Sequence, residues 1–157
     1  MGIGNELKYD DGVGPYIISR LNKLDLNDDV LLINAQTVPE NFTGKIRKEN
    51  PSHIILIDAC LMGLDYGDYK IVDKDDFVNI GISTHSMSLS YFVKFLNPDN
   101  ILFIGIEPQL LELIDQDSIG LLNVNLMDFN GKLTDNVEKS ANKIIELFGG
   151  ILWKFYL

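Results

Sequence analysis

The sequence predicts a three-layer α/β fold with a mostly parallel central sheet and helices on both faces. Two stretches, His53–Ala59 and Asn100–Ile106, are the continuous apolar runs expected of strands that are buried on both faces. Helix-like patterns lie between the predicted strands, and this alternation is typical of the α/β class. Because such sheets bind ligands outside the carboxyl ends of their strands, we expect a functional site at that edge.

The composition indicates one domain, residues 1–157, with an ordinary hydrophobic content of 46%. The net charge of −10 argues against nucleic acid or an anionic membrane as a partner, and it suits a cation or a basic peptide. The single cysteine, Cys60, excludes an intramolecular disulfide and fits a reducing cytoplasm. No apolar run approaches the roughly 20 residues that span a bilayer. We therefore expect a cytoplasmic protein that does not associate with membranes, and we take a monomer as the default expectation.

The first fifteen residues predict a strand-to-helix loop that presents a carboxylate. Two adjacent acids, Asp10 and Asp11, lie in a polar loop, and Pro15 suits the first turn of the helix that follows. The glycines that bracket this loop are Gly2, Gly4, Gly12 and Gly14. The helix is predicted from the spacing of Tyr16, Ile17, Arg20, Leu21 and Leu24.

Two other interpretations of this loop stay open. Gly-x-Gly also begins dinucleotide-binding loops, but the third glycine of that motif is replaced by Leu7, and Asp10 and Asp11 would repel a phosphate. Taken alone, the segment is also compatible with a plain surface turn.

The remaining elements follow from apolar runs and their end markers. We expect strands at residues 30–35 and 69–72, and helices at residues 37–50, 87–96 and 135–148. Residues 73–78 suit a short helix or turn, and no element is predicted for residues 109–128. Pro51 ends one helix, and the pair Gly149 and Gly150 is expected to end the last one.

Three polar residues are expected to meet at the carboxyl edge: Asp11 after the first strand position, Asp58 at the end of the central strand, and His85 in a loop that begins a helix. Two carboxylates and an imidazole suit a divalent transition metal, and three protein ligands leave coordination positions open. Each of the three has a simpler interpretation. Asp11 and His85 also suit helix caps, and Asp58 also suits the acceptor of a hydrogen bond in a turn.

Other polar residues are expected to lack a functional role. We predict that Asp10 is solvated, that His53 is on the surface and that Cys60 is a buried, inert thiol. The acids Asp73, Asp75 and Asp76 suit a solvated helix start better than a second metal site.

The chain resembles the nickel-iron hydrogenase maturation proteases, and it is most similar to the hydrogenase 3 maturation type. The resemblance covers most of the chain to about Phe148. It is carried by Gly2-Ile-Gly-Asn5, Asp10-Asp11-Gly-Val-Gly-Pro15, Val38-Pro-Glu-Asn41, Asp58-Ala-Cys-Leu-Met-Gly-Leu64, Thr84-His85-Ser-Met87 and Phe103-Ile-Gly-Ile-Glu-Pro108.

The resemblance implies an α/β fold and an endopeptidase. The substrate would be the precursor of a hydrogenase large subunit, which loses a short carboxyl-terminal extension after nickel insertion. Asp11, Asp58 and His85 match the metal-binding positions, and they would bind the nickel that the precursor carries. Zinc or cadmium would also fit this site.

Two questions about the chemistry stay open at this stage. Either the metal polarises the scissile carbonyl or a carboxylate activates water. Asp11 and Asp58 would alternatively act as a catalytic pair that shares a proton, as in aspartic proteases. A function from another class is a nickel-sensing chaperone that binds the large subunit without cutting it.

The sequence departs from the family at its start, because family members have an apolar first strand before the glycine motif. A central parallel strand leaves unpaired backbone groups when it is absent. We expect either that residues upstream of Met1 are missing from this chain or that residues 151–157 form a strand in the vacant position. Ile, Trp, Phe and Tyr in this tail favour a strand, whereas Lys154 argues against a central one.

Overall fold

The computed structural model describes residues 1–73, 92–94, 96, 100–111 and 132–154. Its centre is a five-stranded sheet in the order β2-β1-β3-β5-β4, in which β4 is antiparallel to β5 and the other pairs are parallel. The strands are β1 (Gly2–Ile3), β2 (Asn34–Gln36), β3 (His53–Ala59), β4 (Tyr69–Asp73) and β5 (Asn100–Ile106). The helices are α1 (Val13–Leu21), α2 (Thr43–Glu49) and α6 (Asp135–Lys154), and the short 3₁₀ turns η1 (Tyr9–Gly12) and η2 (Pro39–Phe42) precede α1 and α2.

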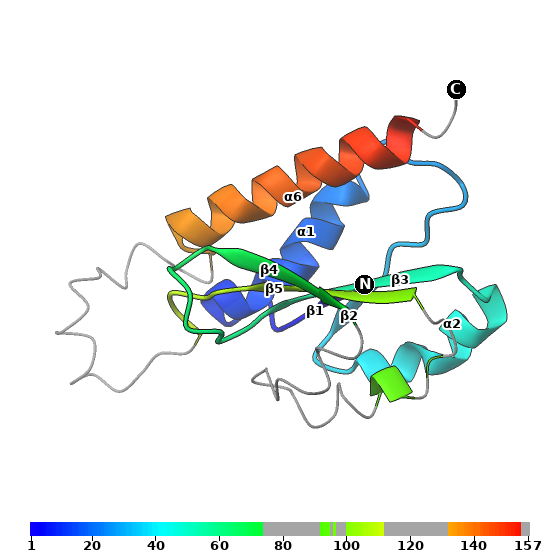
Figure 1. The fold of residues 1–157 in the computed structure, drawn as a ribbon, viewed down its shortest axis with the longest axis horizontal. Coiled ribbons are helices and arrows are strands. Elements are labelled where there is room, and N and C mark those ends of the chain that lie inside the picture. Colours follow the sequence, from blue (N-terminus) through cyan, green and yellow to red (C-terminus); the bar gives the residue numbers. More distant parts are fainter. Residues whose placement is uncertain (74–91, 95, 97–99, 112–131, 155–157) are drawn as a thin grey trace, which may run out of the picture.

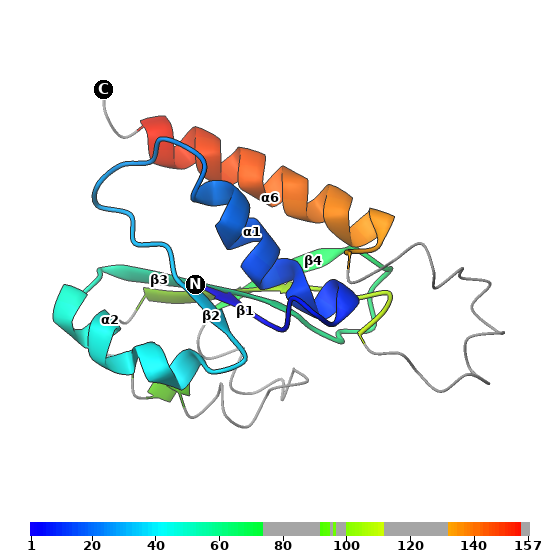
Figure 2. The ribbon, with the colours of Figure 1, turned by 180° about the vertical axis from the view of Figure 1, so that it is seen from behind.

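The helices lie on both faces of the sheet, as the sequence predicts. Figures 1 and 2 show α1 and α6 side by side over one face and α2 on the other. The predicted fold class, a three-layer α/β fold with a mostly parallel sheet, is confirmed.

Each face of the sheet has its own hydrophobic core, because side chains alternate along a strand. In β3, Ile54 and Leu56 belong to the core on the α2 face, whereas Ile57 and Ala59 pack with α1 and α6. This two-sided burial explains why the central strands are unbroken apolar runs.

The predicted bounds of His53–Ala59 and Asn100–Ile106 are correct, and the strand predicted at residues 69–72 is one residue longer. The strand predicted at residues 30–35 is instead β2, Asn34–Gln36. The helix predicted at residues 37–50 is divided into η2 and α2. Most of residues 73–78, 87–96 and 109–128 lie outside the described residues, although Phe92 and Leu96 are buried in the core on the α2 face.

The chain's first residues occupy the position between β2 and β3. The Met1 nitrogen donates to the Ile55 carbonyl at 2.7 Å, and the Met1 carbonyl accepts from the Ile57 N–H at 2.9 Å. On the other side, the Gly2 N–H donates to the Ile33 carbonyl. β1 therefore joins both neighbours, but it is only two residues long.

The tail does not form the predicted strand. α6 continues through Gly149 and Gly150 to Lys154, so the expected helix end and the strand expected from residue 151 are both wrong for these residues. The reason is that the apolar stripe extends past the glycines, since Ile145, Phe148 and Leu152 are all half-buried at helical spacing. Residues 155–157 lie outside the described part.

The start of α1 packs on the sheet backbone to backbone. A Cβ on Gly14 would lie 2.3 Å from the Ile3 carbonyl oxygen and 2.5 Å from that of Ile57. A Cβ on Gly2 would lie 2.2 Å from the Gly14 oxygen, and Gly4 has a φ of +130°, which favours glycine. Glycine at these positions lets α1 contact β1 and β3 directly.

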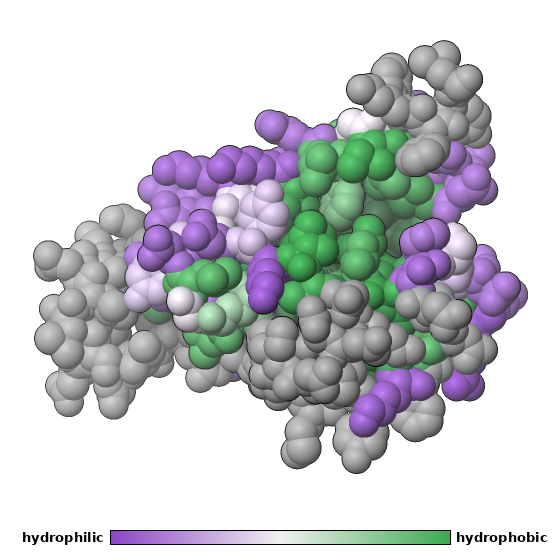
Figure 3. Space-filling model, viewed as in Figure 1, coloured by the Kyte–Doolittle hydropathy of each residue, from purple (hydrophilic) through white to green (hydrophobic). Residues whose placement is uncertain are grey.

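Part of the sheet remains exposed on the α1 and α6 side. Figure 3 shows hydrophobic surface next to the carboxyl-terminal half of α6. The large apolar side chains that are exposed on α6, β4 and β5 include Leu147, Ile151, Ile71 and Leu102. Among the helices of the described residues, none has the length and apolar character needed to cross a membrane.

We predict that Gly14→Ala destabilises the protein by about 3 kcal/mol, because the new methyl group would overlap two backbone carbonyls that are fixed by the sheet. Urea unfolding measures this difference. The matched control is Gly44→Ala in α2, where no atom lies within 4 Å of the added Cβ and a gain of up to about 1 kcal/mol is expected. Equal stability of the two variants would contradict the close contact of α1 with the sheet.

Candidate active site

The candidate site lies at the carboxyl edge of the sheet, where several segments distant in sequence meet. Figure 1 shows η1, the ends of β3 and β5 and the start of α6 at this edge. Within the described residues, buried carboxylates are found here on η1, β3 and the residue after β5: Asp10, Asp11, Asp58 and Glu107.

Asp58, near the end of β3, is fully buried at 0% exposure. Neither of its carboxylate oxygens has a hydrogen-bond partner in the described part of the protein. Burial raises the pKa of the Asp58 carboxyl well above its usual range, and the charge of Asp11 raises it further. The backbone N–H of Ala59 opposes this shift without reaching hydrogen-bond geometry. A buried carboxylate without partners is costly, so this position favours a proton or a cation.

Asp11 belongs to η1 and is only 4% exposed. Its Oδ2 accepts a hydrogen bond from the Asn5 N–H at 2.9 Å, which fixes one side of the carboxylate. The helix-cap interpretation is not supported, because Gly12 occupies the N-cap position of α1 and Asp11 lies inside η1. The structure therefore brings the predicted residues Asp11 and Asp58 close enough for their charges to interact.

The third predicted residue, His85, lies outside the described residues, so its position relative to Asp11 and Asp58 stays a prediction. Within the described ranges, no group of three or more His, Cys, Asp and Glu side chains is arranged to hold a metal ion. Asp75 and Asp76 also lie outside these ranges.

The prediction that Asp10 is solvated is wrong. Asp10 is 0% exposed, and its two oxygens accept hydrogen bonds from Gln109, Leu110 and Thr134. Burial raises the pKa of the Asp10 carboxyl, and these hydrogen bonds oppose the shift. The sequence shows two adjacent acids but not their directions, and in the folded chain Asp10 points toward the start of α6 while Asp11 bonds to the Asn5 loop.

Glu107 is a further residue of this edge, and the sequence pattern predicted no role for it beyond its place in the motif Phe103-Ile-Gly-Ile-Glu-Pro108. This residue is 4% exposed, and its Oε2 accepts hydrogen bonds from the N–H groups of Met62 and Leu64. Its backbone bonds to Gly67 and Asp68. Glu107 therefore fixes the loop between β3 and β4. Its position one residue after β5, at the same sheet edge as Asp58, was the available indication.

The interpretations of Cys60 and His53 are confirmed. Cys60 is buried, and burial, with smaller contributions from the charges of Asp58 and Glu107, raises the pKa of its thiol to about 12. It is therefore an unreactive thiol at neutral pH. His53 is exposed and shares a hydrogen bond with the Ser52 hydroxyl at 3.0 Å.

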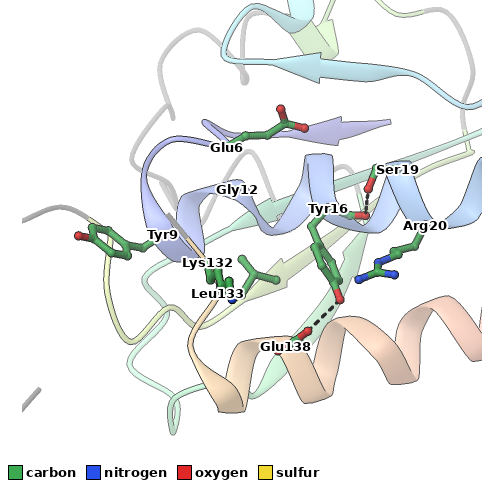
Figure 4. A pocket seen from close by; sticks show the side chains of 9 residues that line it. All are labelled: Glu6, Tyr9, Gly12, Tyr16, Ser19, Arg20, Lys132, Leu133 and Glu138. Atoms are coloured by element: carbon green, nitrogen blue, oxygen red, sulfur yellow. Dashed lines mark hydrogen bonds between the residues drawn. The ribbon is translucent and has the colours of Figure 1, made fainter. Parts of the chain in front are cut away.

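A cavity of about 480 Å³ lies between η1, α1 and the start of α6. Figure 4 shows the Tyr16 hydroxyl pointing to Glu138, to which it donates a hydrogen bond of 3.0 Å. The Arg20 guanidinium lies 5.0 Å from the centre of the Tyr16 ring. Asp11 and Asp58 do not line this cavity, so it belongs to the contact between the two helices and not to the carboxylate pair.

Comparisons with known proteins agree with this architecture. Residues 15–149 match the family model described as hydrogenase maturation protease. The hydrogenase 3 maturation protease of Escherichia coli K12 is 32% identical over 112 residues, which are 69% of this chain and 71% of that protein. A Methanocaldococcus jannaschii relative, which also carries a hydrogenase maturation protease name, is 42% identical over 123 residues, 71% of this chain and 72% of the relative.

The fold is also similar to a solved structure. The crystal structure of the [NiFe] hydrogenase maturation protease HycI from Thermococcus kodakarensis has a TM-score of 0.74 at 27% identity, covering 98% of this chain and 90% of that one. The family match spans most of the chain and includes Asp58 and His85. The chain is therefore a member of the hydrogenase maturation protease family.

Proposed function

We propose that this protein is an endopeptidase that removes a short carboxyl-terminal extension from the precursor of a nickel-iron hydrogenase large subunit after nickel insertion. Asp11, Asp58 and His85 bind the nickel that the precursor already holds. The observation that supports this proposal is the Asp58 carboxylate, which is buried without a hydrogen-bond partner among the described residues, next to the charge of Asp11.

The carboxylate pair suits a cation for electrostatic reasons. Two like charges in a buried place repel each other, and the free enzyme reduces this repulsion through the raised pKa of Asp58. A divalent cation removes the same repulsion and supplies the partner that the Asp58 oxygens lack. Oxygen ligands from the aspartates and nitrogen from His85 are a set that fits borderline divalent metals.

Nickel acts in this proposal as a part of the substrate. Cysteine thiolates of the precursor hold the ion strongly, and the protease adds weaker oxygen and nitrogen ligands from outside. Precursor without nickel offers the aspartates nothing to bind. Cleavage is thereby coupled to completed metal insertion, and premature removal of the extension is avoided.

The bond that breaks is a peptide bond, to which one water molecule is added. The water oxygen bonds to the carbonyl carbon, the carbon–nitrogen bond breaks, and the departing nitrogen takes up a proton. Asp11 and Asp58 supply carboxylates that accept the proton of water and return it to the leaving amine. The raised pKa of Asp58 is a property of the metal-free enzyme, and a bound cation would lower this pKa again.

We predict that Asp58→Asn reduces processing of nickel-loaded precursor by about 100-fold or more, because the amide neither transfers the proton nor balances the charge of a cation. Mass spectrometry of the precursor measures the shortened product. The control is Asp65→Asn, an exposed acid in the loop after β3, which is expected to process at the wild-type rate. Wild-type turnover by the Asp58→Asn enzyme would refute the site assignment.

The same assay separates the protease from the nickel-sensing chaperone. The wild-type enzyme is expected to shorten nickel-loaded precursor and to leave nickel-free precursor intact. Binding of nickel-loaded precursor without a shortened product would support the chaperone instead, and rapid cleavage of nickel-free precursor would contradict recognition through nickel.

We also predict a pH-dependent effect of Asp58 on the stability of the metal-free enzyme. The unfolded chain has an Asp58 pKa of about 3.9, and the folded pKa is well above its usual range. Between these two pKa values, Asp58 is ionised in the unfolded chain and still protonated in the folded one. Rising pH therefore favours the unfolded state, and the free energy of unfolding of the wild-type protein decreases progressively. The Asp58→Asn variant has no ionisable group at this position, so its free energy of unfolding does not show this decrease.

Urea unfolding from pH 4 to pH 8 tests this prediction. The free energy of unfolding of Asp58→Asn relative to wild type is expected to increase with pH and to be smallest near pH 4. Asp65→Asn is expected to stay within about 0.5 kcal/mol of wild type throughout, as is usual for surface positions. A pH-independent difference for Asp58→Asn would show that Asp58 has no raised pKa.

A further inference from the structure

We infer that Asp10 is a positioning residue for the proposed reaction: its carboxylate fixes the η1 turn so that Asp11 faces Asp58. The role of the Asp11–Asp58 pair rests on the proposed function, whereas the placement of Asp11 is a property of the folded chain. The two statements are therefore separable by experiment.

Asp10 joins three segments that are far apart in the sequence. Its Oδ2 accepts hydrogen bonds from the Gln109 N–H at 2.9 Å, the Leu110 N–H at 2.8 Å and the Thr134 hydroxyl at 3.0 Å. Its Oδ1 accepts from the Thr134 N–H at 2.7 Å. The Asp10 N–H donates in turn to the Leu110 carbonyl at 3.0 Å. One residue thus ties η1 to the chain after β5 and to the residue before α6.

These contacts determine where the next residue points. η1 is only four residues long, and Asp10 lies inside it, directly before Asp11. On the other side of the turn, Asp11 Oδ2 accepts from the Asn5 N–H at 2.9 Å. The two adjacent carboxylates are therefore held by different partners, one by the scaffold and the other by the Asn5 loop. Any rotation of η1 that releases Asp10 also moves Asp11 relative to Asp58.

Asp10 acts through Asp11 and not on the substrate, because protein donors already occupy both of its buried oxygens, whereas the Asp58 oxygens have no hydrogen-bond partner among the described residues. Its partners are three backbone N–H groups and one hydroxyl, and such a set needs two acceptor oxygens on a short side chain. Asparagine has only one acceptor oxygen in its side chain. Its NH2 group would therefore face at least one N–H donor, and that hydrogen bond would be lost. Hydrogen bonds to a charged acceptor are also stronger than those to a neutral one.

The test compares Asp10→Asn and the milder Thr134→Val with controls that affect stability alone. Val137→Ala removes buried packing volume in the first turns of α6 and leaves the Asp10 hydrogen bonds in place. Thr134→Ser keeps the hydroxyl. All measurements are made on folded protein, well below the unfolding temperature of each variant.

The first readout is the backbone amide of Asn5, which reports the position of Asp11 without a metal or a substrate. In NMR spectra, Asp10→Asn is expected to shift this resonance and to accelerate its hydrogen exchange, and Thr134→Val is expected to do so to a smaller extent. Val137→Ala and Thr134→Ser are expected to leave it unchanged. A role limited to global stability would make Asp10→Asn and Val137→Ala alike.

The second readout is the affinity of the free enzyme for cadmium, measured by titration. Asp10→Asn is expected to weaken binding by about 10- to 100-fold, as is typical when a residue that orients a ligand is changed. In the Asp11→Asn background the effect of Asp10→Asn is expected to disappear, because the two residues act as one unit. In processing assays, Asp10→Asn is expected to lower kcat/KM for nickel-loaded precursor, because the displaced Asp11 binds the nickel of the precursor less tightly.

An unchanged Asn5 amide together with cadmium affinity within twofold of wild type would overturn the inference. If wild-type enzyme does not bind cadmium, the metal part of the proposed function fails, and the Asn5 amide alone decides the role of Asp10. If Asp10→Asn does not fold, the same two readouts on Thr134→Val against Thr134→Ser decide it.

Discussion

The direct contact of the α1 backbone with the backbones of β1 and β3 is the constraint on which the candidate site depends. Gly14 lies against the carbonyls of Ile3 and Ile57, and Gly2 lies against Gly14. The turn before α1 is thereby brought to the end of β3, where Asp58 is located. With any side chain at Gly14, the helix would be lifted from the sheet and Asp11 would move away from its partner.

The buried carboxylates of the site differ in their hydrogen bonding. Asp10 and Glu107 each accept several hydrogen bonds and hold loops in place. Asp58 lies among them with no hydrogen-bond partner within the described residues. The supporting carboxylates are satisfied by the protein itself, and Asp58 is left to interact with a ligand or a proton.

The sequence predicted the parts of the fold that depend on local pattern. β3 and β5 were found with their correct bounds because a strand buried on both faces is a continuous apolar run. The position of Asp58 followed from the end of that run. The proximity of Asp11 to Asp58 followed from the fold class, because carboxyl ends of parallel strands share one edge of the sheet.

The errors concern features that only tertiary contacts decide. Two adjacent aspartates look equivalent in a sequence, and the direction of Asp10 depends on donors about a hundred residues away. The end of α6 was misplaced because two glycines cost about 1 kcal/mol each in a helix, which the continuing apolar stripe offsets. The strand predicted at residues 30–35 was placed too early because its apolar residues precede β2.

The partners of Asp10 have a consequence for protein synthesis. Asp10 is synthesised before its donors, and its acceptor oxygens meet them only after Gln109, Leu110 and Thr134 have been added, 99 to 124 positions later. Until then the turn that carries Asp11 has only contacts with earlier parts of the chain, such as the hydrogen bond from the Asn5 N–H to Asp11. A nascent or stalled chain therefore lacks the hydrogen bonds of Asp10, and the arrangement of η1 in the folded protein is completed only once nearly the whole domain has been made.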